Sequence, residues 1–482
     1  MTEETRAATG DPRPSALDTA PEPGMTFKEA LSAGGRATLG VLLGLQLLDS
    51  VDNAVFAIFT PEIRESLGVS SSAVSNVGSL TGVMVALAAL PLGVLGDRRR
   101  RTTIAGVCTL AWALAAALLG MVQNLWQAAA VRILAGIGKA NEGPIQISIL
   151  TDAYPPAGRG RVLGVHRGAQ PLGVVAGPAF AALVAAVVPE EHEPWRWAYA
   201  SVAVVGLLLA LATLRLREPV RGRFEREAAV DGGPPPPNAA PVPLRVAFAR
   251  LRKIRTFHHA MLALGAFGLC VTTVPFYLSQ ILGDQLGQGA TTRSVVFALC
   301  SIGGLVGATL GGVYGDRLFR RNPKASLHLA GGTIGVLGTG LAVQAYAPDV
   351  TTFVVVGMLT QALVFGGIIS LSLIVAAVVP PVFRATAFAL VSLYLAVVGG
   401  LGGALATTVV ASLWGQQAAV AVVAPVASAV AGLVLIAGAG HLRHDIAQVD
   451  VAVRDEQAQR PHAQAARPRL PGRDHQEDRD PQ

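Results

Sequence analysis

The 482-residue sequence has few charged side chains and very few cysteines. Only 14% of its residues are charged, whereas 52% are hydrophobic and 54 are glycine; a soluble chain normally has about 25% charged residues. Cys108, Cys270 and Cys300 stand alone in apolar stretches, which excludes a disulfide framework or a metal site with cysteine spacing. A shortage of charge together with many glycines, which let membrane helices pack closely, indicates a membrane protein with many spans.

Several functional motifs are also absent. The sequence has no phosphate-binding loop, which argues against ATP-driven work by this chain alone. It has no cluster of His and Asp residues that would suit a membrane enzyme acting on lipids, so we expect no enzyme activity. Residues 1–35 contain no apolar core, and we expect no cleavable signal peptide. The net charge of +7 comes from arginine-rich loops, which indicates topology rather than a nucleic-acid partner.

Long apolar runs are what the chain has in abundance. A helix that spans a bilayer needs about 20 apolar residues, and twelve runs have this character. They lie near residues 37–60, 73–96, 102–122, 126–150, 161–188, 197–215, 258–282, 294–315, 327–347, 351–379, 385–411 and 417–440. The sequence therefore predicts an all-α membrane protein with twelve transmembrane helices in two six-helix bundles.

The polar segments set the domain boundaries. The bundles cover residues 37–215 and 257–440, and an arginine-rich linker, 216–256, lies between them. Residues 1–36 and 441–482 are polar, and we expect them to be disordered tails.

Arginine and lysine are divided unequally between the two sides of the predicted bundles. If both termini lie on one side, the loops of the other side contain only Arg64, Arg196 and Arg293. The remaining basic loops, including residues 98–101 and the linker, then share the side of the termini. Because cytoplasmic loops are enriched in Lys and Arg, we expect cytoplasmic termini in a multi-pass protein of the plasma (inner) membrane. We also expect the protein to act as a monomer.

A short motif is repeated in the two halves. Residues 93–101 read GVLGDRRRR after the second run, and residues 312–321 read GVYGDRLFRR after the eighth. The same pattern at the same place in each half indicates duplication of a six-helix unit. The motif resembles the G-x-x-x-D-R-x-G-R-R loop signature of the major facilitator superfamily of secondary transporters.

The resemblance implies the major facilitator fold, with two pseudo-symmetric bundles, and a conformational latch. In such a latch a carboxylate pairs with nearby arginines and with the N-terminus of a facing helix, and these contacts break as the halves rock. The alternative is that the arginines only set the topology. The latch residues that the motif implies are Gly93, Asp97, Arg98, Arg101, Gly312, Asp316 and Arg317.

The fifth run resembles a second pattern of this family. Residues 164–182 read GVHRGAQPLGVVAGPAFAA, similar to the glycine-proline motif of the family's antiporters. Gly164, Gly173, Gly177 and Pro178 match at the expected spacing. Proline bends a helix and small residues let another helix approach the bend. The resemblance implies efflux of substrate by proton antiport, and ordinary small-residue packing is the alternative.

Three stretches are similar to the spinster-like group within the superfamily. They are RILAGIG at 132–138, GRGRVLGV at 158–165 and the segment from Trp195 that ends in REPVRG. This group carries lysolipids and sphingoid phosphates, which implies lipid transport or another amphiphilic substrate. Lys139 stands where the group has a glutamate, and Glu142 follows three residues later. Either Glu142 has taken over the role of that acid or the coupling differs.

Charged residues within the apolar runs are confined to the first half. An ionised residue at the bilayer centre costs roughly 2.5–3.5 kcal/mol, so such residues usually have a function. The first run contains Asp49 and Asp52, and the fourth contains Arg132, Lys139 and Glu142. Helix geometry puts Asp52 at the depth of Arg132 and Asp49 near Lys139, and it puts Glu142 one turn from Lys139. We therefore expect an Asp52–Arg132 pair and a Lys139–Glu142 pair.

These charges suggest proton coupling. A carboxylate that faces opposite sides in turn changes its surroundings, and its affinity for a proton changes with them. Asp52 beside Arg132 is the first candidate for the proton carrier, Glu142 beside Lys139 is the second, and Asp49 lies nearby. Static ion pairs that orient two helices are the alternative. For the substrate we expect contacts from Lys139, Arg132, Asn141 and Asn53.

The sequence as a whole predicts a proton-coupled secondary transporter. We expect an amphiphilic or lipid-like substrate, with export favoured, and proton-coupled uptake of a small organic anion as the alternative. The proton gradient would supply the energy, so we expect no cofactor. The expected partners are the substrate, protons and the lipid bilayer.

Overall fold

The computed structural model describes residues 25–221, 224, 249–379 and 384–465, and nearly all of them are helical. The first half comprises α1 (Phe27–Gly34), α2 (Arg36–Ile58), α3 (Thr60–Leu67), α4 (Ser71–Arg98), α5 (Arg101–Leu119), α6 (Leu125–Lys139), η1 (Glu142–Gln146), α7 (Ile147–Ala153), α8 (Pro156–Val187), η2 (Glu190–His192) and α9 (Pro194–Leu214). The second half comprises α12 (Arg255–Asp284), α13 (Ala290–Arg321), α14 (Pro323–Ala345), α15 (Val350–Val378), α16 (Arg384–Tyr394), η4 (Leu395–Leu401), α17 (Gly402–Trp414) and α18 (Gln416–Ala465).

Eleven helices of the described residues are long and apolar enough to cross a membrane. Residues 125–153 form the twelfth crossing, which the sequence predicts as one helix over 126–150. The structure divides it into α6, the π-helical turn η1 and α7. Pro144 has no N–H to donate, and Gln146 N bonds the carbonyl of Asn141 five residues earlier, at 3.2 Å. The break therefore falls where the sequence places Gly143 and Pro144.

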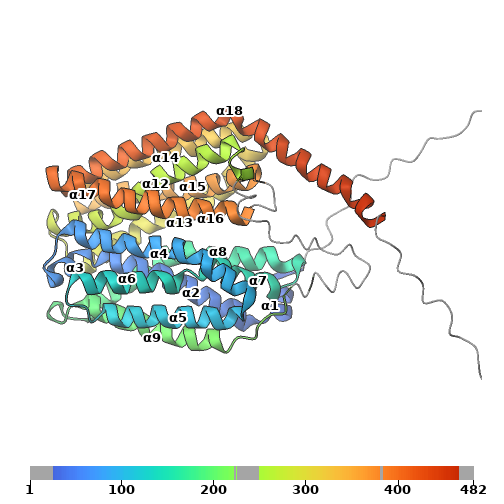
Figure 1. Ribbon diagram of the computed structural model, residues 1–482. Helices are drawn as coiled ribbons and strands as arrows, with labels where there is room; N and C mark the ends of the chain where they lie inside the picture. Colours follow the sequence, from blue (N-terminus) through green and yellow to red (C-terminus); the bar gives the residue numbers. More distant parts are fainter. Residues whose placement is uncertain (1–24, 222–223, 225–248, 380–383, 466–482) are drawn as a thin grey trace, which may run out of the picture.

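The helices run side by side in two bundles (Figure 1). In the first half α8 packs against α2, and it also contacts α13 of the second half. On the other flank α4 faces η4 and α17. The end of the molecule that carries α1 and the last turns of α18 is called the terminal end here, and the opposite end, which carries α3, is called the α3 end (Figure 1).

Glycines allow the closest helix approaches. A Cβ atom on Gly303 of α13 would lie 1.9 Å from the carbonyl oxygen of Met358 in α15. At η4, a Cβ atom on Gly399 would lie 2.6 Å from Cα of Gly268 in α12. No larger residue fits at these crossings unless the helices move apart, which explains part of the high glycine content.

Both predicted tails contain helix, which corrects the expectation of disorder in those parts. Residues 27–34 form α1, whose start is capped by Thr26 and Glu29 in a reciprocal pair of hydrogen bonds. The twelfth helix does not end at 440 but continues to Ala465, because residues 441–465 are rich in Ala, Gln and other helix formers. The remaining parts of the predicted tails, residues 1–24 and 466–482, lie outside the described residues.

The extension of α18 has a packing role. Asp445 is 4% exposed and accepts a hydrogen bond of 2.7 Å from the backbone N–H of Thr256. This carboxylate satisfies a free donor at the start of α12. Residue 445 therefore belongs to the second bundle rather than to a tail.

Candidate functional site

Five side chains from α2 and α6 meet in the middle of the first half. Asp52 and Asn53 both lie about one turn after Asp49 on α2, and Arg132 and Lys139 lie two turns apart on α6, so each set lies on one side of its helix. The Lys139 ammonium is 2.8 Å from an Asp49 oxygen, contacts Asp52, and donates to Asn53 Oδ1 at 3.2 Å. We call these five residues the charge cluster.

Arg132 completes the charge cluster from the side of the α3 end. Its Nη1 atom is 3.5 Å from the Asp52 carboxylate, as the depth comparison predicts. Its guanidinium carbon lies 4.2 Å from the centre of the Phe56 ring, and Lys139 Nζ lies 5.0 Å from the centre of the Trp112 indole. Aromatic faces stabilise cations that have left water. Two carboxylates and two cations thus balance to zero net charge.

The members of the charge cluster differ in exposure. The side chains of Asp52, Arg132 and Lys139 are 3%, 2% and 4% exposed, whereas Asp49 is 23% exposed and Asn53 is exposed. Asn53 also donates to Asp49 at 3.1 Å, which orients the more accessible carboxylate. A solute or a proton therefore meets Asp49 and Asn53 first, and Asp52 lies behind them.

The predicted Lys139–Glu142 pair is wrong. Lys139 pairs with the two aspartates of α2, and no ion pair with Glu142 is found among the described residues. The reason is the π turn η1, which begins at Glu142 and changes the angular spacing on which the one-turn estimate depends. Glu142 still lies within electrostatic range of Asp49, Arg167 and Lys139.

Asn141 forms hydrogen bonds at the helix break and is not part of the charge cluster. Its side chain is buried, donates to the carbonyl of Gly138 at 2.7 Å and accepts from Gln146 Nε2 at 3.0 Å. These bonds satisfy polar groups around η1. The structure thus brings Asn53 to Lys139 but does not bring Asn141 there.

The glycines of the fifth predicted span set the distance between α8 and α2. A Cβ atom on Gly173 would lie 2.3 Å from Cβ of Ser50, and one on Gly177 would lie 2.5 Å from Cβ of Ala54. Ser50 and Ala54 flank the acidic residues of α2, so these glycines seat α8 directly against the site helix. Gly164 has no such neighbour within 4 Å, and Pro178 lies inside α8.

Two ion pairs join the halves at the α3 end, and the sequence reasoning missed both. Arg64 of α3 forms two hydrogen bonds to Asp284 of α12, at 2.6 and 2.9 Å. Arg293 of α13 is 3% exposed and contacts the carboxylate of Glu62. The sequence analysis treats Arg64 and Arg293 only as loop charges.

The closure at the α3 end extends beyond the ion pairs. Six polar pairs between the halves lie toward this end. They are Arg64–Asp284, Glu62–Arg293, Ser279–Ile58, Gln280–Ser71, Gln416–Ser71 and Asn76–Thr408. The halves are therefore held together at the α3 end.

Arg101 is the centre of a different network at the terminal end. Its buried guanidinium donates to Glu218 Oε1 at 2.9 Å, to Ser148 Oγ at 2.8 Å and to the Pro219 carbonyl at 2.9 Å, and it also contacts Asp152. The other Glu218 oxygen accepts from the backbone N–H and the hydroxyl of Thr102, both at 2.8 Å. Burial raises the pKa of Glu218, but the hydrogen bonds from Thr102 and Arg101 outweigh it and lower that pKa.

This network contains Arg101, one residue of the predicted latch, and the latch itself stays a prediction. Arg101 joins α5, α7 and residues 218–219, which all belong to the first half, so it does not bridge the halves. Arg98 and Arg317 are exposed, and a Cβ atom on Gly93 would lie 3.4 Å from Pro144. Gly312 and the side chains of Asp97 and Asp316 lie outside the described part of the structure, so their role stays a prediction. Because residues 216–221 are anchored to the first half, the start of the predicted linker belongs to that half.

Two six-helix halves, joined at one end and carrying ionised groups buried within one half, form the architecture of a membrane transporter rather than of an enzyme. The chain belongs to the Major Facilitator Superfamily, whose sequence profile matches residues 42–373. This match confirms the superfamily resemblance and the fold of twelve helices, and it identifies a multi-pass membrane protein of a transporter family.

Individual relatives agree with this family. The probable L-galactonate transporter of Escherichia coli (strain K12) is 28% identical over 270 residues, which are 54% of this chain and 58% of that one. Protein spinster of Drosophila melanogaster is 25% identical over 206 residues, 42% of this chain and 33% of that one. The matched parts therefore span about half of these relatives or less.

A solved structure shows the same fold. The crystal structure of a bacterial homolog to the human lysosomal transporter spinster, inward-facing and unoccupied, has a TM-score of 0.69 at 18% identity. The alignment covers 85% of this chain and 96% of that one. The sequence similarity to the spinster relative confirms the resemblance to the spinster-like group, and the solved structure shows the shared fold.

Proposed function

We propose that this protein is a proton-coupled transporter of a small organic anion. The observation that carries the proposal is the balance of the charge cluster, in which Asp49 and Asp52 already neutralise Lys139 and Arg132. A third negative group in this buried place would be left without a free cation, which costs several kcal/mol. An anion therefore binds well only after a proton has neutralised one of the aspartates.

The transport cycle follows from this balance. A proton on Asp52 releases Lys139 and Arg132 from their shared carboxylate, and the two cations bind the oxygens of the substrate, with Asn53 beside them. Rocking of the halves then opens the charge cluster to the other side, and the contacts at the α3 end break or form again according to the direction of transport. When the anion leaves, Asp52 gives up its proton and the aspartates pair with the cations again. Anion and proton move in the same direction.

The named relative supports an organic acid as the substrate class, since galactonate is a sugar acid. The spinster resemblance supports a second candidate, which is export of an amphiphilic, lipid-like molecule against protons. The close seating of α8 on α2 by Gly173 and Gly177 fits the antiporter pattern of the second candidate as well. The two candidates differ in the direction in which the proton moves relative to the substrate.

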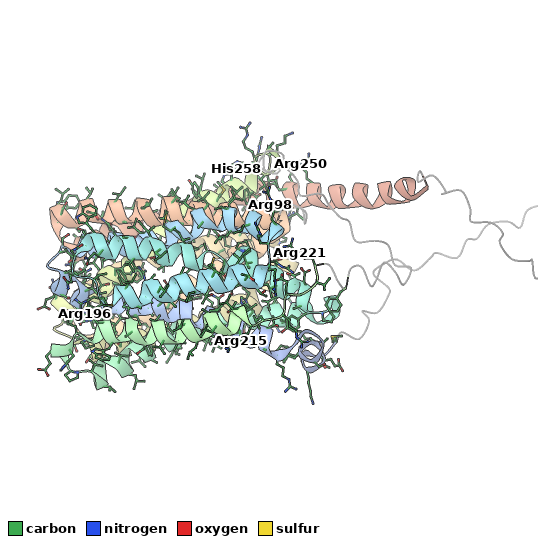
Figure 2. The ribbon with its side chains drawn as sticks, turned by 60° about the horizontal axis from the view of Figure 1, so that its bottom comes forward. Arg98, Arg196, Arg215, Arg221, Arg250 and His258 are labelled. Atoms are coloured by element: carbon green, nitrogen blue, oxygen red, sulfur yellow. The ribbon has the colours of Figure 1, made fainter. Side chains whose placement is uncertain are left out.

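We further propose that the terminal end faces the cytoplasm and that the protein lies in the plasma membrane. Figure 2 supports this orientation: Arg98, Arg215, Arg221 and Arg250 gather at the terminal end, and Arg196 lies at the opposite end. Loops rich in arginine stay on the cytoplasmic side. The protein would then be open toward the cytoplasm when the α3 end is closed.

Proton flux in proteoliposomes separates the candidates. With a pH dye in the lumen and no imposed gradient, we expect sugar acids or small sulfonates added outside to acidify the lumen. Lysolipids should give no such signal. Alkalinisation of the lumen by lysolipids, with no response to organic acids, would contradict the symport proposal and support proton antiport of an amphiphile.

A further inference from the structure

A hollow of about 490 Å³ opens at the terminal end of the first half. It is lined by four arginines, Arg98, Arg99, Arg100 and Arg221, and by Glu218 and Val220. We call it the arginine hollow. Figure 2 shows Arg98 and Arg221 at the end of the bundle away from Arg196. The charge cluster and the contacts at the α3 end use none of these residues.

Three arginines, Arg98, Arg99 and Arg100, give the arginine hollow an excess of positive charge over its described carboxylate. Glu218 is the one carboxylate in its described lining, and both its oxygens are already bonded, one to Arg101 and the other to Thr102. Arg98, Arg99 and Arg100 form no ion pair with any residue that the structure describes. Arg221 donates to the carbonyl oxygens of Gly96 and Arg99, which holds its guanidinium at the rim. The hollow is therefore built for an anion that comes from elsewhere.

The position of the arginine hollow places it at the membrane surface. The membrane-spanning part of α4 ends at Gly96, that of α5 begins at Arg101 and that of α9 ends at Leu214. Val94 and Leu95, one turn before Arg98, are 48% and 43% exposed, and Val220 in the lining is 59% exposed. Such apolar side chains at the ends of spans face lipid tails, so the hollow lies at the depth of the phospholipid headgroups.

We propose that the arginine hollow binds the phosphate headgroup of an anionic phospholipid. Guanidinium groups bind phosphate oxygens in pairs, and basic pockets beside transmembrane helices suit acidic headgroups. The bound headgroup draws residues 218–221 onto the ends of α4 and α5, while the acyl chains lie along Val94, Leu95 and Val220. Lipid binding therefore stabilises the network of Arg101 and Glu218 in the first half.

The full-length protein in detergent provides the test, with its melting temperature measured while phosphatidylglycerol or phosphatidylcholine is added. We expect phosphatidylglycerol to raise the melting temperature more than the zwitterionic lipid. The double variant Arg99→Gln with Arg100→Gln should need roughly thirtyfold more phosphatidylglycerol for half of the effect. Both residues are exposed, so the variant should fold.

A matched control removes the same charge from the same end. The double variant Arg250→Gln with Arg252→Gln changes two exposed arginines outside the hollow, and we expect it to respond like the unmodified protein. Equal loss in the two double variants, or an equal response to both lipids, would overturn the proposal. Free glycerol phosphate that protects as well as phosphatidylglycerol would overturn the assignment to a lipid.

Discussion

The two six-helix halves share a fold but hold their charges in different places. In the first half, Asp52, Arg132 and Lys139 are buried within the spans. In the described part of the second half, the buried charged side chains are Arg293 and Asp445, and both lie near the ends of membrane spans. The two halves therefore share a duplicated fold but not the same buried charged residues. The charges to which we assign coupling lie within the spans of the first half, whereas the buried charges of the described second half lie near the ends of its spans.

The halves also differ in what their charges join. The charge cluster and the Arg101 network each stay within the first half, whereas the ion pairs at the α3 end cross between halves. Charges within one half keep its helices together through the transport cycle. Charges between halves must separate whenever the α3 end opens, so their strength sets the balance between conformations.

Removal of a cation from the charge cluster should have the largest effect. Lys139→Met leaves Asp49 and Asp52 short of a partner, and we expect a loss of about 3–5 kcal/mol in stability together with loss of transport. Thr272→Val in α12 is the comparison in the second half, where the hydroxyl bonds only its own helix, and about 1 kcal/mol is expected. Thermal unfolding of the purified variants measures both. Similar losses would contradict the difference between the halves.

The buried ion pair at the α3 end should have the next largest effect. Glu62→Gln leaves Arg293, which is 3% exposed, without its carboxylate. We expect a shift of about 2–3 kcal/mol toward opening of the α3 end. The rate at which a water-soluble maleimide labels a cysteine placed at Ser279 should rise accordingly. An unchanged labelling rate would show that this pair does not hold the halves together.

The Arg101 network should have a pH-dependent effect confined to the first half. Because the folded pKa of Glu218 is lowered, its ionised form stabilises the fold at neutral pH, and this contribution is lost as the pH falls through that pKa. We expect the melting temperature of the unmodified protein to fall further between pH 7 and pH 4 than that of Glu218→Gln. At pH 7 the variant should lose about 1.5–3 kcal/mol. Parallel pH curves would contradict this role.

The exposed ion pair at the α3 end should have the smallest effect. The side chains of Arg64 and Asp284 are 27% and 31% exposed, so water screens their attraction. Asp284→Asn should shift the same labelling assay by about 1 kcal/mol or less. High salt should reduce the difference between this variant and the unmodified protein, while Glu62→Gln should keep its effect. An Asp284→Asn effect larger than that of Glu62→Gln would reverse the ranking by burial.

Features that depend on regular helix geometry were predicted from the sequence, whereas local departures from that geometry were not. Run lengths predicted the spans, and helix rise predicted the Asp52–Arg132 pair, because both depend on regular α-helix geometry. The Lys139–Glu142 prediction failed because η1 breaks that regularity at the residues in question. Composition favoured disorder after residue 441, yet Asp445 continues α18 and caps α12.

Contacts between loop charges of distant segments could not be predicted from the sequence. Glu218 reaches Arg101 across 117 residues, and Arg64 reaches Asp284 across 220. A local sequence pattern does not indicate which of the many loop charges form ion pairs with each other. The role of the helix-five glycines was visible as small-residue packing, but their partners Ser50 and Ala54 required the structure.

The most direct test of coupling in the first half uses Asp52→Asn, which mimics the protonated carboxylate. In proteoliposomes with an inward proton gradient, we predict that the variant loses gradient-driven accumulation of the organic anion. It should still exchange labelled for unlabelled anion, with an affinity that no longer depends on pH. Gradient-driven accumulation that persists in Asp52→Asn at the level of the unmodified protein would contradict the account.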